Sequence, residues 1–337
     1  MTATFLELVD LAAERFGGAV VDANDEFFAA KENLIKREPP AWREGEYTER
    51  GKWMDGWETR RRRDLATAGP DAHDWCIVRL GARGIVRGLD VETTFFTGNY
   101  PESCALDACD ITGMPTPGDL QSAPWRALLA RTALRGDAHN LIPIDAATPA
   151  THLRLRIFPD GGVARLRVHG EVVANWGRLR QRGEVDLAAA EHGGVVVCCS
   201  DMFYGSRHNL IMPGDAVNMG DGWETKRRRG PGHDWTIVRL AARGTVRRAE
   251  IDTRHFKGNA PGECSLHGCV AGDDATVQNA ASDDEELWRE LLPRTPLQPH
   301  MRHVFDELRA SSSVTHVRLN IYPDGGVGRL RLFGTPE

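Results

Sequence analysis

The chain has 337 residues, 41% of them hydrophobic, with a formal net charge of −6 and a sequence pI near 6.1. This length allows two domains of ordinary size, and the mildly acidic balance argues against a nucleic-acid binder, whose domains are usually basic. No stretch approaches the roughly 20 apolar residues that a membrane span needs, so neither nucleic acid nor a membrane is an expected partner.

The N-terminal segment, residues 1–16, is predicted to be a short amphipathic helix, because its apolar residues recur at helical spacing. Glu7, Asp10 and Glu14 interrupt the uncharged apolar core that a secretory signal peptide would need. The seven cysteines are an odd number, which is more typical of reduced thiols than of a disulfide framework. We therefore expect a cytoplasmic protein.

An internal repeat covers nearly the whole chain. The matching blocks are GGAVVDANDEFFAAKENLI (17–35) with GGVVVCCSDMFYGSRHNLI (193–211), HDWCIVRL (73–80) with HDWTIVRL (233–240), FFTGNYPESC (95–104) with HFKGNAPGEC (255–264), WRALLART (125–132) with WRELLPRT (288–295), and THLRLRIFPDGGVARLRVHG (151–170) with THVRLNIYPDGGVGRLRLFG (315–334). Each copy has the size of an ordinary domain rather than of a solenoid unit. The sequence therefore predicts a first repeat at 17–170, a linker at 171–192 and a second repeat at 193–337.

Most of each repeat is predicted to be β-strand. In THLRLRIF, Leu153, Leu155 and Ile157 alternate with polar residues, which indicates a strand with one buried face. The PDGG turn and the renewed alternation after it predict a β-hairpin. Helical signal is confined to the N-terminal segment, the linker around VDLAAAEH and short turns such as WRALLA. Many short strands between Gly/Pro turns predict an all-β fold of two tandem antiparallel jelly-roll β-sandwiches, with short helices at the N-terminus and in the linker.

The repeats resemble the allantoicase family. The resemblance rests on SDMFYGSRHNLI, the DGWETRRRR and DGWETKRRR segments, the HDW segments, FTGNYP with FKGNAP and the PDGGV turns, and it runs from about 17 to 335. It implies galactose-binding-like jelly rolls, a homo-oligomer, and hydrolysis of allantoate to ureidoglycolate and urea in purine (allantoin) degradation. The alternative function is a non-catalytic tandem module that binds carbohydrate or another small ligand, because this architecture hosts both kinds of function.

The segments at 55–63 and 221–229 carry the predicted acid/base and anion-binding groups. Cleavage of a C–N bond of allantoate needs a cation for the carboxylate, a general acid for the leaving urea and a general base for water. In an extended strand, one carboxylate and two cations of each copy share a face, opposite a tryptophan that enters the core. These residues are Glu58, Arg60 and Arg62 in the first copy, and Glu224, Lys226 and Arg228 in the second. Cross-strand salt-bridge ladders are the structural alternative for these charges.

His73 and His233, in the two HDW segments, form the second pair of predicted catalytic residues. Histidine is the side chain most easily tuned to work near neutral pH. The alternative is a strand-entry turn in which Asp74 caps local N–H groups. Because adjacent residues of a strand point to opposite faces, His73 and Asp74 are not expected to pair with each other.

Further polar residues complete the predicted binding set. Asn99 and Asn259 lie in GN pairs that are typical of turns and could also bind a ureido group, and Arg207 and His208 lie in the polar loop SDMFYGSRHNLI. Two more histidine pairs, His152 with His316 and His139 with His303, are expected at solvated strand positions and in loops, respectively.

No metal or cofactor is predicted, and a divalent-metal requirement is left open. Cys104 and Cys109 recur as Cys264 and Cys269, but no CxxC partner follows and no HExxH motif occurs. Buried neutral thiols at equivalent core positions are the better interpretation. The copies differ at several polar positions, so the site could survive in one repeat or form where the repeats meet.

Overall fold

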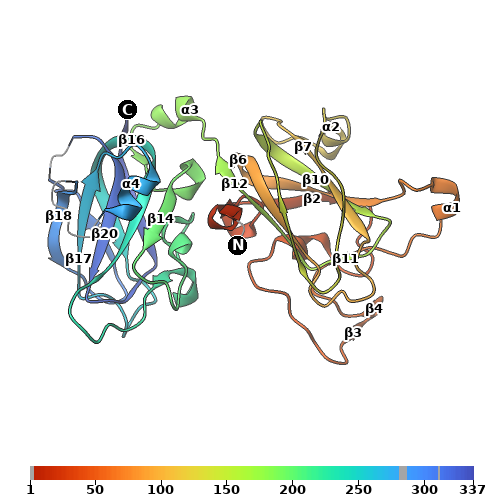
Figure 1. Cartoon of the computed structure of the whole chain (residues 1–337), viewed down its shortest axis with the longest axis horizontal. Coiled ribbons are helices and arrows are strands. Elements are labelled where there is room, and N and C mark those ends of the chain that lie inside the picture. The colour runs from red at the N-terminus through yellow and green to blue at the C-terminus, as the bar shows by residue number, and fades with distance from the viewer. Residues whose placement is uncertain (1–3, 281–286, 310–311) are drawn as a thin grey trace. The chain divides into compact units, whose positions relative to one another are not determined.

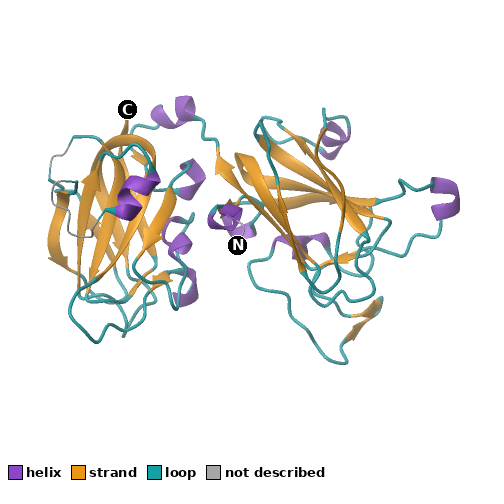
Figure 2. Cartoon of the chain, viewed as in Figure 1, coloured by secondary structure: helices purple, strands orange, loops and turns teal. Residues whose placement is uncertain are grey.

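The structure is a computed structural model that describes residues 4–280, 287–309 and 312–337. It divides into two compact units, Met1–Val173 and Ala174–Glu337, each built mainly of strands (Figures 1 and 2). Among the described residues, no helix combines the length and the apolar character needed to cross a membrane. The expected all-β fold of two tandem β-sandwiches is confirmed.

The first domain contains twelve strands and a few short helices. Its strands are β1 (Val9–Asp10), β2 (Ala19–Ala23), β3 (Tyr47–Thr48), β4 (Gly51–Lys52), β5 (Trp57–Glu58), β6 (Asp74–Glu92), β7 (Ser103–Cys109), β8 (Arg126–Ala133), β9 (His139–Pro143), β10 (Ala150–Phe158), β11 (Gly162–Val163) and β12 (Arg165–Val172). Its helices are α1 (Leu65–Ala68), α2 (Pro117–Gln121) and the 3₁₀ turns η1 (Thr4–Glu7), η2 (Glu14–Phe16) and η3 (Lys31–Ile35).

The long strand β6 belongs to both layers of the sandwich. Its first half, from Asp74 to Arg79, pairs with β2 and β10, and β10 continues the sheet through β7 to β8. Its second half, from Gly84 to Glu92, pairs with β12 and β9, and β12 continues to β1. Gly84 lies at the change of partners, where an added Cβ would fall 2.8 Å from the Glu171 carbonyl oxygen.

The core lies between the layers and follows the predicted alternation. Leu153, Leu155 and Ile157 of β10 are fully buried, as expected for one face of a strand. Trp57 is also fully buried, and its indole Nε1 donates a 2.8 Å hydrogen bond to the Asp25 carbonyl. The burial of such a large side chain fixes the start of the DGWET segment against the core.

The second domain repeats this plan. Its strands are β13 (Val185–Asp186), β14 (Val195–Cys199), β15 (Trp223–Glu224), β16 (Asp234–Asp252), β17 (Glu263–Cys269), β18 (Arg289–Pro296), β19 (Arg302–Phe305), β20 (Val314–Tyr322), β21 (Gly326–Val327) and β22 (Arg329–Pro336). Its helices are α3 (Trp176–Arg180), α4 (Asp274–Asn279), η4 (Ala190–His192), η5 (Arg207–Ile211) and η6 (Met219–Asp221). The strand order β13-β22-β16-β20-β17-β18 mirrors β1-β12-β6-β10-β7-β8.

The segments expected to be an N-terminal helix and a linker belong to the two sheets. Val9–Asp10 forms β1 and Val185–Asp186 forms β13, each paired with the last long strand of its domain. The sequence carried this signal, because VDLAAERFGG at 9–18 matches VDLAAAEHGG at 185–194. Each repeat therefore begins earlier than the sequence blocks suggested. Within the described residues 4–16, the expected N-terminal helix is represented by the 3₁₀ turns η1 and η2.

WRALLA, expected as a helical turn, lies mostly in strand β8, which runs from Arg126 to Ala133 along β7. Its apolar residues are consecutive, so they fit either a helical turn or a strand, and a neighbouring edge decides the outcome.

Candidate active site

Glu58 is held in place by backbone pairing on both sides. Strand β5 pairs with β11 so that Glu58 lies opposite Gly162, and Glu58 also bridges to Ala29. Gly162 packs so closely on the ring of Phe96 that an added Cβ would fall 1.9 Å from a ring carbon. A larger residue at 162 would therefore displace the strand that positions the carboxyl group.

The side chain of Glu58 is buried and hydrogen-bonded. Its exposed fraction is 9%, and Asn99 Nδ2 donates a 2.7 Å hydrogen bond to Oε1. Asn99 is held in turn by its own carbonyl, which accepts a 2.7 Å hydrogen bond from the Gly162 amide. Burial raises the pKa of Glu58, and the hydrogen bond from Asn99 offsets only part of this effect.

Glu58 and Asn99 line a pocket of about 280 Å³ in the first domain. Phe28, Met54 and Phe95 supply apolar walls to this pocket, which we call the Glu58 pocket. A carboxyl group surrounded by apolar side chains is a recurrent setting for a general acid, because such surroundings keep the group protonated.

The mouth of the Glu58 pocket carries a cation on an aromatic ring. Lys52 and Trp42 both line the pocket, and Lys52 Nζ lies 3.8 Å from the centroid of the Trp42 ring. Trp42 packs on Phe95 with ring centroids 5.6 Å apart. Within the described parts of the chain, no carboxylate forms an ion pair with Lys52, so its charge is available to an anionic ligand.

Lys52 and Trp42 were not among the predicted site residues. They lie in a segment that the second repeat lacks, because Ile35 and Asp55 are 20 positions apart, whereas Ile211 and Asp221 are only 10 apart. The extra residues include the hairpin β3–β4, which carries Lys52. This difference in length is the sequence feature that could have indicated Lys52 and Trp42. The prediction was based on residues that both repeats share, and it therefore left this segment out.

The second domain retains the carboxyl–amide pair but changes its surroundings. Asn259 Nδ2 donates a 2.5 Å hydrogen bond to Glu224 Oε1 and also lies 3.8 Å from the sulfur of Met219. The shorter connection between η5 and β15 supplies no counterpart to Lys52 or Trp42. The two domains thus share the carboxyl–amide pair and differ in the residues around it.

The predicted cations do not share a face with the carboxyl groups. The strands β5 and β15 are only two residues long, so the extended run expected over 57–62 is absent. Each cation contacts an aspartate instead. The pairs are Arg60 with Asp25, Arg62 with Asp64 and Asp74, Lys226 with Asp201, and Arg228 with Asp234. Ion pairs with aspartates, rather than cross-strand ladders, therefore hold these side chains. Contrary to expectation, they do not share a face with Glu58 and Glu224, and ligand binding by them stays a prediction.

His73 and His233 lie outside the Glu58 pocket. His73 Nδ1 is 2.7 Å from the Asp71 carbonyl, whereas buried Asp74 accepts hydrogen bonds from Asn24 and Arg62, so His73 and Asp74 do not pair, as expected. His233 Nε2 is 3.3 Å from Asn320 Oδ1, with its ring against Tyr322. A catalytic role for either histidine remains a prediction.

Arg207 and His208 begin η5 in the second domain. Arg207 Nε donates to the Val196 carbonyl at 3.4 Å, and the amide of His208 donates to Ser206 Oγ at 3.3 Å. The next residue, Asn209, donates to the Gly222 carbonyl at 3.0 Å and so supports the turn before Trp223. These contacts give the loop a structural role, and ligand binding by Arg207 and His208 stays a prediction.

The remaining histidines differ from expectation. His152 and His316 are buried at 2% and 1% exposure rather than solvated, and burial lowers the pKa of both. His139 is not equivalent to His303, because His139 lies opposite Glu92, whereas Arg302 occupies the corresponding place opposite Asp252. His139 Nδ1 is 2.7 Å from Asp90 Oδ2, and that hydrogen bond raises the pKa of His139.

Metal ligation finds no support in the described part of the chain, where no three His, Cys, Asp or Glu residues gather as a metal site. Cys104, Cys109, Cys264 and Cys269 are buried free thiols, and burial raises the pKa of each. Their equivalent core positions match the structural interpretation of the repeated spacing.

These features define a two-domain all-β protein with an acid-bearing pocket in its first domain. The family model described as "Allantoicase repeat" matches residues 9–173 and 185–337. A "Probable allantoicase" of Pseudomonas aeruginosa (strain UCBPP-PA14) is 47% identical, with 99% of this chain and 98% of that protein covered. One of Nocardia farcinica is 50% identical, with 98% and 95% covered.

A solved structure supports the same relationship. The crystal structure of allantoicase from Saccharomyces cerevisiae matches with a TM-score of 0.79 and 32% identity, covering 97% of this chain and 92% of that one. The chain belongs to the allantoicase family.

Proposed function

We propose that the Glu58 pocket is where this member of the allantoicase family hydrolyses allantoate to ureidoglycolate and urea. The observation that carries the proposal is a buried carboxyl group with a raised pKa, hydrogen-bonded to an amide, in a pocket that also contains a lysine cation. A cation can bind the substrate carboxylate, an amide can bind a ureido group, and one carboxyl group can act first as the general acid and then as the general base.

Lys52 is the proposed ligand of the substrate carboxylate. Its ammonium group is exposed at the mouth of the pocket and packs on Trp42, which limits its positions. Asn99 is the proposed ligand of a ureido group. Because its Nδ2 donates to Glu58, its Oδ1 can accept from a substrate N–H. Together these contacts would place the substrate's central carbon near Oε2 of Glu58.

Glu58 is the proposed general acid of the first step. The carboxyl proton passes to the nitrogen of the departing ureido group while the C–N bond to the central carbon breaks. The lone pair of the remaining ureido nitrogen forms a double bond to that carbon, so urea leaves and an iminium-like centre remains. The raised pKa of Glu58 favours the protonated state that this step needs.

The same residue serves as the proposed base of the second step. Water adds its oxygen to the iminium-like carbon, and the Glu58 carboxylate accepts the proton that the water loses. One C–N bond has then been exchanged for one C–O bond, and Glu58 is protonated again. The apolar walls of Phe28, Met54 and Phe95 limit competing water around the reacting carbon.

The decisive experiment measures urea release from allantoate by wild-type protein, Glu58→Gln and Glu224→Gln. Glutamine keeps the shape and can still receive the hydrogen bond of Asn99, but it cannot transfer a proton. Loss of turnover in the first variant alone supports the Glu58 pocket. Equal activity of Glu58→Gln and wild type would reject it, and loss in Glu224→Gln alone would move the site to the second domain.

We also propose a cytoplasmic location and a homo-oligomeric assembly. All seven cysteines are free thiols, which suits a reducing cytoplasm. A homo-oligomer is expected for the assembled enzyme, and sedimentation equilibrium of the full chain tests it by returning a mass above 37.2 kDa.

A further inference from the structure

A second pocket, of about 290 Å³, lies in the second domain and is lined by charged side chains. Its floor comes from neighbouring strands. Glu250 and Asp252 alternate on β16 and so share a face. Arg302 of β19 lies opposite Asp252 on one side, and on the other side Arg329 and Arg331 of β22 lie opposite Asp252 and Glu250. We call this site the Arg302 pocket.

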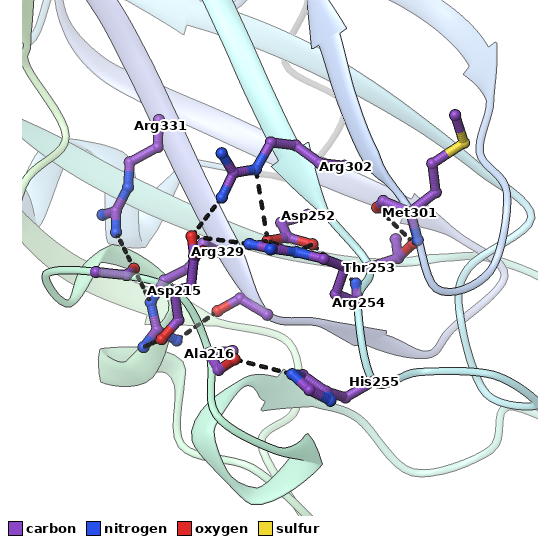
Figure 3. A network of polar contacts seen from close by, with 12 residues as sticks. Asp215, Ala216, Asp252, Thr253, Arg254, His255, Met301, Arg302, Arg329 and Arg331 are labelled. Carbon is purple, nitrogen blue, oxygen red and sulfur yellow. Dashed lines mark hydrogen bonds and ion pairs between the residues drawn. The ribbon is translucent and has the colours of Figure 1, made fainter.

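The loop after η5 forms one wall of the Arg302 pocket. Arg329 Nε and Arg331 Nη2 donate to the Gly214 carbonyl at 3.1 and 2.7 Å, which fixes the loop over the sheet. Asp215 then reaches Arg254 at 2.8 Å and also pairs with Arg302, as Figure 3 shows. The loop is therefore held by side chains from β19, from β22 and from the turn that follows β16.

The Arg302 pocket retains unused hydrogen-bonding groups of both kinds. Among the described residues, the buried Nη1 of Arg331 and the buried Oε2 of Glu191 have no hydrogen-bond partner. Both residues line the pocket. Both atoms are enclosed by neighbouring groups, so a ligand in the cavity can satisfy them once the Arg331 and Glu191 side chains turn toward it.

The mixture of charges restricts the ligand. A simple anion in this pocket would meet Glu250, Asp252 and Asp215, and a simple cation would meet the arginines. A molecule with one carboxylate and several N–H donors satisfies both, because its carboxylate pairs with guanidinium and its N–H groups donate to carboxylates. Ureido acids have this composition.

We propose that the Arg302 pocket binds a small ureido acid, so that each chain holds a second ligand molecule besides the one in the Glu58 pocket. The choice of ligand rests on the proposed function, since the proposed substrate and product are both ureido acids. The buried carboxyl group of Asp186 in this pocket accepts hydrogen bonds from the Ala188 and Leu332 backbone amides rather than from an amide side chain, and no Asn or Gln is among the described residues that line the pocket. We therefore assign the pocket to binding rather than to cleavage.

The first domain does not reproduce this arrangement. The position of Arg302 is occupied by His139, and that of Arg254 by Thr94, which donates to Glu92 at 2.7 Å. The first domain keeps Arg165 and Arg167 opposite Glu92 and Asp90, but it lacks the arginines equivalent to Arg254 and Arg302. We therefore expect one such pocket per chain.

Calorimetric titration with N-carbamoylglycine tests the proposal on the full chain. This probe carries a carboxylate and one ureido group, and it lacks the second ureido nitrogen that would drive cleavage. Wild-type protein should bind two molecules per chain. Arg302→Gln and Glu191→Gln should each weaken one of the two binding events by about 10- to 100-fold, as expected when a charge-assisted hydrogen bond is lost, and should leave the other unchanged.

Arg294→Gln is the matched control, because Arg294 is an exposed arginine of the same domain that pairs with Glu263 outside the Arg302 pocket. One bound probe per chain that neither Arg302→Gln nor Glu191→Gln affects would overturn the proposal. Lys52→Met separates the two sites. If Lys52→Met changes neither probe binding nor urea release, the Glu58 pocket is rejected as the active site. Arg302→Gln and Glu191→Gln would still test ligand binding by the Arg302 pocket.

Discussion

The amide of Asn99 holds the carboxyl group of Glu58 at 2.7 Å, although the two residues lie 41 positions apart in the chain. The second domain repeats the relationship between Asn259 and Glu224. A buried carboxyl group that receives one neutral donor is oriented without being strongly stabilised in its ionised form. The Glu58–Asn99 pair thus combines fixed geometry with a raised pKa of Glu58, which is what a general acid requires.

Glu58→Gln is expected to lower kcat for urea release by about 10² to 10⁴-fold, the usual contribution of a positioned general acid or base. Glu224→Gln, which makes the same chemical change in the second domain, should retain near wild-type kcat. Steady-state kinetics with allantoate measures both. A small effect of Glu58→Gln, comparable to that of its control, would show that proton transfer uses another group.

Lys52→Met is expected to raise KM for allantoate by about 10- to 100-fold, with a smaller change in kcat, because it removes a charged partner of the substrate carboxylate while keeping the packing on Trp42. Lys226→Met is the control, since Lys226 is an exposed lysine of the second domain that pairs with Asp201. An unchanged KM in Lys52→Met would place the substrate carboxylate elsewhere.

Asn99→Ala is expected to move the alkaline limb of the pH–rate profile to higher pH. The hydrogen bond from Asn99 lowers the pKa of Glu58, so its loss leaves burial unopposed and extends the pH range in which the acid is protonated. The measurement is kcat/KM between pH 5 and 10, with Asn259→Ala as the matched variant. A limb that stays in place, or moves to lower pH, contradicts the assignment.

Protein stability should carry the same signature. Because the folded-state pKa of Glu58 is raised, its protonated form contributes stability that is fully present below the unfolded pKa and is lost as pH rises through the folded value. Glu58→Gln removes this dependence. The Tm of the variant relative to wild type should therefore increase as pH rises from 4 to 8. Calorimetric scans of both proteins at several pH values measure this difference. A difference that stays constant with pH would contradict a raised pKa of Glu58.

Arg165→Met should destabilise the first domain by about 3 to 5 kcal/mol, because it removes the hydrogen-bonded cation of Asp55 and leaves only Lys36, whose Nζ lies 3.7 Å from Oδ1. Arg165 is fully buried and donates to Asp55 Oδ2 at 2.8 Å. Arg60→Met, which breaks an exposed pair with Asp25, should cost about 0 to 1 kcal/mol. Denaturant unfolding of both variants makes the comparison, and equal losses would contradict it.

The sequence predicted the fold where its signal was periodic or repeated. The alternation around Leu153 and Leu155 identified a buried strand, and the doubled blocks identified two domains. The short strands β1 and β13 were missed because two residues give no periodicity, and the repeat between 9–18 and 185–194 was overlooked. WRALLA was misassigned because only its pairing with β7 distinguishes a strand from a turn.

Chemical reasoning from the sequence selected Glu58 and Asn99, which lie together in one pocket, although their roles remain to be tested. It also selected Arg60 and Arg62, which pair with aspartates that no local pattern could place beside them. Asp25 and Asp74 reach these arginines only through the folded chain. Lys52 was not predicted, because the second repeat has no matching residue that would have marked its position.

The hairpin that carries Lys52 illustrates how duplicated domains can diverge at a small cost in folding free energy. The connection from Ile35 to Asp55 spans twice as many positions as that from Ile211 to Asp221. Doubling a flexible loop costs only about 0.6 kcal/mol of closure entropy. One of two copies could therefore gain a binding wall by insertion while its sheets, core and carboxyl–amide pair stayed unchanged, and the other copy remained free to develop a different ligand site.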